Sequence, residues 1–208
     1  MALATTKQLR GEVYLMADLE VAALYVQSNG CYSGLSNIDM WDEVRDARLY
    51  GGPLPVVAHP PCARWCQLAG LVEAKYGYKK GADQGCFESA LGSVREWGGV
   101  LEHPAYSLAF ERFGLPIPIR GGWTQGLFCD GWTTELSQSA YGHRARKRTW
   151  LYYVGEAPPS LDWGEPAASA WFSWGDHDRY KKVERMGKVE RNATPIAFRD
   201  LLISMAIQ

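Results

Sequence analysis

The chain has 208 residues, a net charge of −1 and 47% hydrophobic residues, which suits one globular domain with its own core and argues against disorder. No apolar run approaches the roughly 20 residues of a membrane span, and no basic start followed by an apolar stretch opens the chain. We therefore expect a cytoplasmic protein with no membrane partner. Five cysteines form no regular framework, which predicts reduced thiols.

Short apolar strands alternate with helices along the chain. In chain order we predict a strand or short helix at 21–26, a helix at 39–50, a strand at 54–58, a helix at 84–97, a strand at 99–102, a strand at 150–154 and a helix at 195–206. This alternation predicts the α/β class, with a doubly wound, mostly parallel, Rossmann-like sheet. Residues 1–208 are expected to form a single domain, in which 155–190 is a small aromatic and basic insertion.

Reactive side chains stand at the ends of three predicted strands. The first of these strands runs into His59-Pro60-Pro61-Cys62, where two prolines forbid its continuation. The next ends in Glu102-His103-Pro104, and a run of basic residues from Arg144 to Arg148 precedes the third. Because ligands of open α/β sheets bind beyond the strand ends, these groups are predicted to meet in one pocket.

This set, in this order, resembles the cytosine-5 DNA methyltransferase family. In that family one strand ends in Pro-Pro-Cys and a later one in Glu-Asn, a glutamine-and-arginine motif precedes a further strand, and a Gly-Asn-Ala-Val-Pro-like segment opens the last helix. The matching segments here are 60–62, 102–104, 144–148 and 191–195. The pattern is also similar to small proteins of bacterial viruses, which implies bacteriophage DNA modification as the context.

The chemistry of a pyrimidine ring explains why such residues would converge. Carbon 5 becomes reactive only after a nucleophile adds at carbon 6, and the thiolate of Cys62 suits that addition. Charge then develops at ring nitrogen 3, where Glu102, with a raised pKa, would donate a proton or a hydrogen bond. Arg146 and Arg148 would hold the base and stabilise the adduct. The other residues expected to contact substrate are His59, Pro60, Pro61, Arg64, Trp65, His103 and Arg144.

Plainer interpretations stand beside these. A cysteine after a strand is often only a small buried hydrophobe, although the Pro-Pro-Cys context favours catalysis. A zinc site made by His59, His103, Cys66 and Cys62 is less favoured, because paired Cys-x-x-Cys spacing is missing, and no metal is predicted. Residues 79–83 form either a phosphate-contacting loop or a solvated turn. In the insertion, a reduced stacking surface could come from Trp163, Trp171, Phe172 and Trp174.

The group donor is left open by the sequence. The family binds S-adenosylmethionine in an Asp-x-Phe-x-Gly-x-Gly-like loop, and the nearest substitute here, residues 24–32, has one glycine. Asn29, Gly30, Asn192 and Thr194 are the residues expected beside a cofactor, and S-adenosylmethionine is expected to bind weakly.

The function expected from these observations is that of a transferase. It would modify carbon 5 of a pyrimidine, in DNA or in a nucleotide, through a covalent cysteine adduct. One alternative is a carbon-5 transferase that uses a donor other than S-adenosylmethionine. The other is a non-catalytic protein that keeps the base pocket and binds nucleic acid or a nucleotide.

Overall fold

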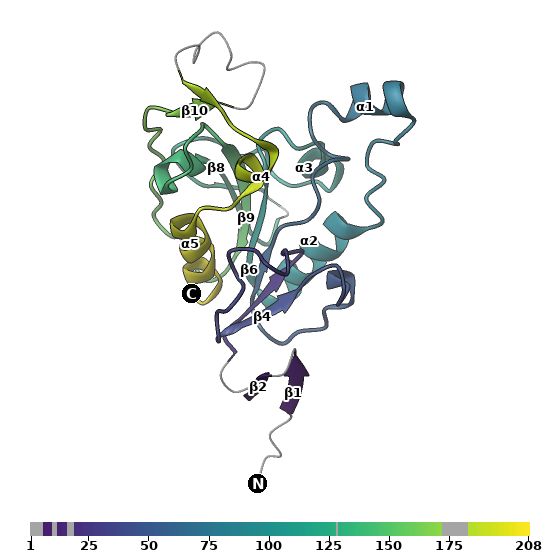
Figure 1. Ribbon diagram of the computed structural model, residues 1–208, viewed down its shortest axis with the longest axis vertical. Helices are drawn as coiled ribbons and strands as arrows, with labels where there is room; N and C mark the ends of the chain where they lie inside the picture. The colour runs from purple at the N-terminus through teal and green to yellow at the C-terminus, as the bar shows by residue number, and fades with distance from the viewer. Residues whose placement is uncertain (1–5, 10–11, 16–18, 128, 172–182) are drawn as a thin grey trace.

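A seven-stranded sheet with strand order β4-β3-β5-β6-β9-β8-β7 forms the centre of the computed structural model, which describes residues 6–9, 12–15, 19–127, 129–171 and 183–208 (Figure 1). Its strands are β3 (Val21–Leu24), β4 (Ile38–Trp41), β5 (Val56–Ala58), β6 (Gly99–Pro104), β7 (Thr124–Gln125), β8 (Trp132–Ser137) and β9 (Arg148–Val154). Two smaller sheets pair β1 (Thr6–Leu9) with β2 (Glu12–Leu15) and β10 (Ala170–Trp171) with β11 (Glu184–Arg185). The helices are α1 (Ala69–Tyr76), α2 (Cys86–Trp97), α3 (Leu108–Arg112), α4 (Lys188–Asn192) and α5 (Ile196–Ala206), with 3-10 helices η2 (Ala47–Leu49) and η3 (Gln138–Tyr141).

The central sheet is mixed. Strands β4, β3, β5 and β6 run parallel, whereas β9 is antiparallel to both of its neighbours, β6 and β8. Only residues 138–147 connect β8 to β9, and a parallel crossover needs about a dozen residues or more, so these two strands must pair as antiparallel neighbours. The predicted α/β class is confirmed, but the sheet is mixed where a mostly parallel one was expected.

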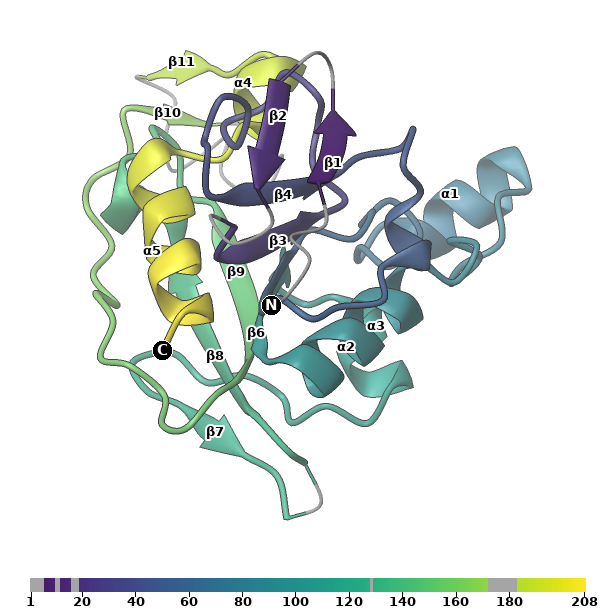
Figure 2. The same cartoon turned by 90° about the horizontal axis from the view of Figure 1, so that it is seen from below.

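Helices cover both faces of the sheet. Figure 2 shows α5 on one side and α2 on the other. Alternate strand residues separate accordingly: Leu24 and Leu101 pack in one buried cluster with Phe87 of α2, and Val57 packs in a second with Phe198 of α5. The α2 face is therefore opposite to the α5 face, and successive residues of each strand point to different sides.

Most of the predicted elements are present. The strands expected at 21–26, 54–58, 99–102 and 150–154 and the helices at 84–97 and 195–206 are confirmed, with shifted ends. The helix expected at 39–50 is wrong, because residues 38–41 pair with β3 as β4. The buried Asp39 accepts hydrogen bonds there from Arg45 at 2.6 Å and from the Trp41 indole at 2.8 Å. Tertiary pairing thus overrides the local pattern.

The helices are short. In the part of the chain that the structure describes, no helix has the length and apolar character needed to cross a bilayer. The insertion expected at 155–190 includes β10 and β11, and its residues 172–182 lie outside the described residues.

Candidate active site

One edge of the central sheet gathers the ends of several strands. Parallel strands β5 and β6 both finish there, and their register places Ala58 beside Leu101. Because β9 runs antiparallel to β6 and β8, its first residues lie at the same edge: Thr149 pairs with Pro104, and Arg148 pairs with Ser137. The turn after β5, the end of β6, the turn after β8 and the approach to β9 therefore meet.

Both carboxylate oxygens of Glu102 are held by neighbouring side chains. His59 Nδ1 lies 3.2 Å from Oε2. Gln138 Nε2 donates to Oε1 at 3.1 Å and also to the hydroxyl of Thr149 at 3.0 Å. On the far side of the His59 ring, Nε2 lies 2.9 Å from the Tyr32 hydroxyl. Four side chains from separate segments of the chain thus fix the orientation of Glu102.

The pKa of Glu102 lies below its ordinary value. Burial of the carboxyl group raises the pKa, but the hydrogen bond and charge of His59, with a smaller effect of the Lys147 charge, lower it further than burial raises it. The raised pKa expected for a proton donor is therefore not found. Because its pKa is lowered, the Glu102 carboxyl group is ionised near neutral pH and accepts hydrogen bonds.

Cys62 begins a tight turn and is exposed at the surface. Its carbonyl oxygen accepts hydrogen bonds from the amides of Trp65 and Cys66 at 2.9 and 3.0 Å. Although the residue is exposed, the protein around its sulfur restricts hydration and raises the thiol pKa, as do Glu102 and Cys66, while the charge of Lys147 lowers it. Cys62, Glu102 and Lys147 are therefore close enough to affect one another electrostatically.

Lys147 lies in the candidate site, although it was not among the site residues predicted from the sequence. Its Nζ donates to the carbonyl oxygen of Ala193 at 3.1 Å. Burial lowers the pKa of this ammonium group, whereas the charges of Glu102 and Cys62 raise it. Alternation along β9 explains its position: Trp150 packs in the cluster with α2 and Leu151 in the cluster with α5. Lys147 and Thr149 stand at alternate positions before Leu151, so they lie on the same α5 face, as does Glu102.

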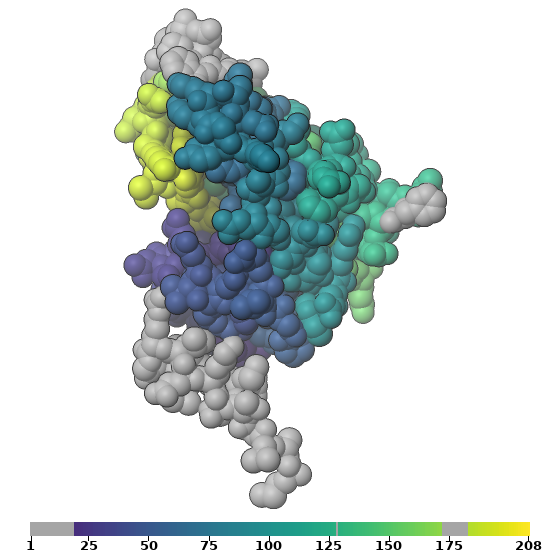
Figure 3. Space-filling view, turned by 90° about the vertical axis from the view of Figure 1, so that its right-hand side faces the viewer, coloured from purple at the N-terminus to yellow at the C-terminus, as the bar shows by residue number. Residues whose placement is uncertain are grey.

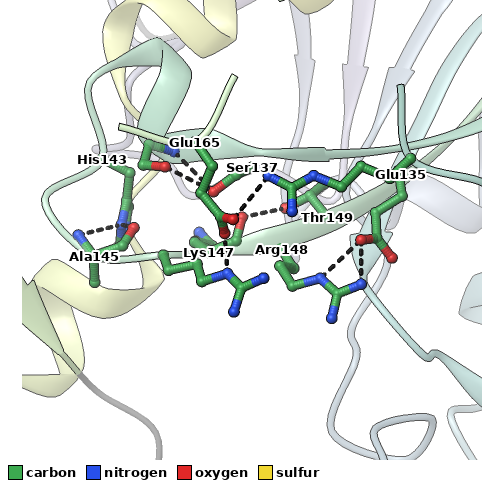
Figure 4. A network of polar contacts seen from close by, with 11 residues as sticks. Glu135, Ser137, His143, Ala145, Lys147, Arg148, Thr149 and Glu165 are labelled. Atoms are coloured by element: carbon green, nitrogen blue, oxygen red, sulfur yellow. Dashed lines mark hydrogen bonds and ion pairs between the residues drawn. The ribbon is translucent and has the colours of Figure 1, made fainter. Parts of the chain in front are cut away.

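The neighbouring arginines pair with other carboxylates. Arg148, on the α2 face, binds Glu135 through its Nε at 2.7 Å (Figure 4). Its guanidinium also lies 4.6 Å from the ring centre of Tyr106. Arg146 forms an ion pair with Glu165. Arg144 contacts Glu184 at 2.9 Å and Glu190 at 2.7 Å. The predicted contacts of these three arginines with a base would have to replace these ion pairs.

Three residues expected to contact substrate, Pro60, Trp65 and His103, are buried instead. Trp65 is 6% exposed, and its indole donates to Asp83 at 2.7 Å. His103 is fully buried, with its ring 5.1 Å from that of Phe87 and near the carbonyl groups of Pro60 and Pro61. Neither ring is available to a base, so both residues support the turn that carries Cys62. Pro61 is exposed beside Cys62, and Arg64 lies 4.3 Å from the ring centre of Tyr78.

The two segments expected to hold a cofactor lie near each other. Arg199 of α5 donates to the carbonyl oxygen of Cys31 at 2.7 Å, which ties the loop of Asn29 and Gly30 to the helix that follows Asn192 and Thr194. However, the amide of Gly30 already donates to Gln27 within its own turn, at 2.9 Å. This single glycine does not provide a cradle of free amides, so the residues do not fit the donor loop of the resembled family.

Two surface hollows lie apart from Cys62 and Glu102. One of about 200 Å³ is lined by Gly142, His143, Arg144, Met186, Glu190, Ala193, Thr194 and Pro195. One of about 400 Å³ is lined by Trp65, Gly81, Asp83, Gly85, Glu88, Arg112 and Phe113. Among the described residues, no group of three or more histidine, cysteine or acidic side chains could hold a metal ion.

Two tryptophans of the predicted stacking surface lie in the described part of the insertion. The Trp163 indole donates to the hydroxyl of Thr134 at 3.0 Å, and Arg185 lies 5.6 Å from the ring centre of Trp171. Phe172 and Trp174, the other members of the predicted stacking surface, lie outside the described residues.

No family model, curated protein or solved structure matches the chain. Its chemistry must therefore be argued from the geometry of the site. Lys147 could have been found from the alternation of residues that approach a strand. Tyr32 and Gln138 gave no such signal, because β8 was not predicted and Tyr32 lies in a loop eight residues beyond β3.

Proposed function

We propose that this protein is a pyrimidine-modifying enzyme that forms a covalent bond between the Cys62 sulfur and carbon 6 of the ring. One observation carries the proposal: an exposed thiol, a buried carboxylate and a lysine ammonium group interact at the edge where β5 and β6 end. Thiolate is a strong nucleophile, and the addition needs a group at nitrogen 3 that can form a hydrogen bond and transfer a proton.

The proposed reaction adds the Cys62 thiolate to the ring, replaces the hydrogen at carbon 5 and then releases the thiolate. The Cys62 thiolate attacks carbon 6, and the electron pair of the carbon 5–carbon 6 bond moves toward nitrogen 3, which takes a proton from Glu102. Since its lowered pKa keeps Glu102 ionised near neutral pH, it must first gain that proton, which passes to it through His59, whose Nδ1 lies 3.2 Å from Oε2. Carbon 5 then attacks an electrophile and loses its hydrogen as a proton, and the thiolate leaves carbon 6 while nitrogen 3 returns its proton to the Glu102 carboxylate, which restores the ring.

The positive charge of Lys147 has a separate role in this scheme. Both Glu102 and Cys66 disfavour the thiolate of Cys62, whereas Lys147 favours it. His59 is not positioned as the base of the thiol, because its second nitrogen is engaged with Tyr32. Lys147, together with a backbone hydrogen bond to the sulfur, therefore stabilises the nucleophile before attack.

The proposal extends to the class of enzyme. The resemblance to cytosine-5 DNA methyltransferases supports a transferase that acts on DNA or on a pyrimidine nucleotide, in bacteriophage DNA modification and in the cytoplasm of the host. We leave the donor open, since the amide of Gly30, the single glycine of residues 24–32, already donates to Gln27.

Hydrogen exchange at carbon 5 tests the proposal without knowledge of the donor. In D₂O, addition of the thiolate to carbon 6 lets carbon 5 take a deuteron, and elimination then removes the original hydrogen. Mass spectrometry of deoxycytidine- and deoxyuridine-containing oligonucleotides, and of the mononucleotides, should show deuterium incorporation with the wild-type protein. Cys62→Ser should abolish it, and Cys129→Ser should not. No exchange with any of these substrates, or unchanged exchange with Cys62→Ser, would overturn the proposal.

A second candidate is a binding protein that keeps the base pocket without chemistry. The raised pKa of the Cys62 thiol favours it, because little thiolate is present near neutral pH. This candidate predicts that pyrimidine substrates bind equally well to the wild type and Cys62→Ser, with no deuterium incorporated by either protein.

A further inference from the structure

Residues 64–81 form a projecting segment that begins just after Cys62. Its two ends lie next to each other at the surface of the domain. The amide of Gly81 donates to the carbonyl oxygen of Arg64 at 2.9 Å and closes this excursion, which we call the arm. Gly81 has a φ of +77°, and a Cβ there would lie 3.1 Å from the Trp65 ring, so glycine permits the close approach. Figure 1 shows α1, within the arm, projecting from the sheet, and Figure 3 shows the same segment protruding in blue-teal.

The arm is held at its base and has little core of its own. Ala69 is the buried residue of α1, whereas Leu71 is 68% exposed. Gly77, with a φ of 70°, ends the helix and reverses the chain, so that Tyr76 and Tyr78 lie on either side of it. These tyrosines are 59% and 54% exposed. Core packing therefore does not explain why two large aromatic side chains stand at these positions.

Aromatic and basic groups alternate on this surface. The rings of Tyr76 and Tyr78 lie 6.4 Å apart, with 34° between their planes. Arg64 lies 4.3 Å from the ring centre of Tyr78, and Lys75 Nζ lies 5.1 Å from that of Tyr76. Exposed Lys79 and Lys80 follow directly. The arm thus carries four basic residues and one acidic residue, in a chain whose net charge is −1.

We propose that the arm binds single-stranded polynucleotide, with bases against Tyr76 and Tyr78 and phosphates beside the lysines. Exposed aromatic rings interleaved with cations are how sequence-tolerant proteins bind single strands, since each base offers a face for stacking. A duplex keeps those faces covered by its own stacking. A strand is therefore the partner that these groups fit.

The position of the arm deepens the proposed function, on which this part of the inference rests. The arm begins two residues after Cys62, so nucleotides that flank a base at Cys62 would extend onto it. A free nucleotide has no flanking bases to stack on Tyr76 and Tyr78. The substrate class is accordingly a pyrimidine within a single strand.

Fluorescence anisotropy with a 5′-fluorescein-labelled oligothymidylate of about 20 nucleotides, long enough to span such a site, tests binding by the arm. The wild type should bind this strand more tightly than a duplex of equal length. Tyr76→Ala and Tyr78→Ala should each weaken binding about ten-fold or more, as loss of a stacked base does, whereas Tyr76→Phe and Tyr78→Phe should not. Replacing both Lys79 and Lys80 with alanine should reduce the slope of log affinity against log salt by about 1.4.

Lys188→Ala is the matched control, because Lys188 is an exposed lysine on α4 outside the arm and the site. It should bind the strand like the wild type. A Tyr76→Ala/Tyr78→Ala double variant that retains wild-type circular dichroism and full affinity would overturn the inference, and so would tighter binding of the duplex. A matched oligouridylate titration distinguishes DNA from RNA; preference for either sugar, with the same dependence on the tyrosines, supports the inference.

Failure of this inference can be separated from failure of the proposed function. Cys62→Ser should bind the strand with wild-type affinity. If binding depends on the two tyrosines but no deuterium enters carbon 5, the arm inference stands and the proposed chemistry is wrong. If deuterium enters carbon 5 of a mononucleotide, but the affinity for the strand is unchanged in Tyr76→Ala and Tyr78→Ala, the proposed chemistry stands and the arm inference is wrong.

Discussion

At the scale of single residues, neighbouring charges act in opposite directions on the Cys62 thiol. Burial and the carboxylate of Glu102 raise its pKa, and Lys147 lowers it. Arg148 is adjacent to Lys147 in sequence but points to the other face of the sheet, where Glu135 binds it. Two neighbouring cations therefore differ in their expected effect on the same thiol.

Replacement of Lys147 should slow the reaction of Cys62 with an alkylating agent. In Lys147→Gln the thiol loses the charge that favours its ionised form, so its pKa rises further and less thiolate is present at a given pH. The pH dependence of iodoacetamide modification, followed by mass spectrometry of the Cys62 peptide, measures this shift. Arg148→Gln is the control and should leave the curve where it is. Equal curves for Lys147→Gln and the wild type would contradict the placement of Lys147.

His103 should make the protein less stable as the pH falls. Burial lowers its pKa to about 4, against an ordinary value near 6.5, so the unfolded chain takes up the proton first. The stability contributed by the neutral ring is complete above about pH 6.5 and is lost as the pH falls toward 4. Between pH 7 and 5 the loss should be about 2 kcal/mol in the free energy of unfolding.

Urea denaturation at pH 7 and pH 5 measures this loss. The variant His103→Gln, which keeps a polar side chain of similar size but does not titrate, should show a smaller difference between the two pH values by about 2 kcal/mol. The range stays above the region where Glu102, with its lowered pKa, takes up a proton. An unchanged pH dependence in His103→Gln would mean that another group is responsible.

At the scale of elements, the start of β6 depends on a glycine. Gly99 has a φ of +108°, and a Cβ at this position would collide with the backbone carbonyl of Val56 on β5. The pairing of β5 with β6 positions the segments of both Cys62 and Glu102. A side chain at residue 99 would therefore disturb the site as well as the core.

A pair of glycine substitutions tests this dependence. Gly99→Ala should lower the free energy of unfolding by about 3 kcal/mol or more, because backbone strain and overlap with Val56 both oppose it. Gly92→Ala is the control: Gly92 lies within α2 with nothing near a new Cβ, and alanine should stabilise that helix by up to about 1 kcal/mol. Thermal or urea denaturation measures the stability of both variants. Similar changes for Gly99→Ala and Gly92→Ala would contradict the dependence of β6 on a glycine at residue 99.

At the scale of the whole molecule, the loop that connects β3 to β4 bears on the choice of donor, because it holds one glycine between residues 24 and 32. The loop after β3 uses the amide of Gly30 in its own turn, so we expect S-adenosylmethionine to bind with a dissociation constant in the high micromolar range or weaker. Isothermal titration calorimetry with S-adenosylmethionine, and with S-adenosylhomocysteine for comparison, measures it. Low-micromolar binding would contradict this expectation and direct attention to the region between Gly30 and Thr194.

The sequence by itself determined several of the local elements, among them β5 and α2, and the residues at their ends. Proline after a short β-branched run located the end of β5 before Cys62, and the spacing of Phe87, Leu91 and Val94 located α2. These signals are local, because backbone restriction and side-chain periodicity act within a few residues. Glu102 could likewise be assigned to a strand end from the pattern around it.

Only the tertiary structure decided which residues at the strand ends lie on the same face of the sheet and which of them are buried. Pairing of β9 with β6 and β8 set the face on which each basic residue lies, and it placed Lys147, not Arg148, on the face of Glu102. Burial removed Trp65 and His103 from contact with a ligand, and His59 lowered a carboxyl pKa that was expected to be raised. Strand register, burial and charge proximity depend on residues far apart in the chain, so local sequence patterns do not reveal them.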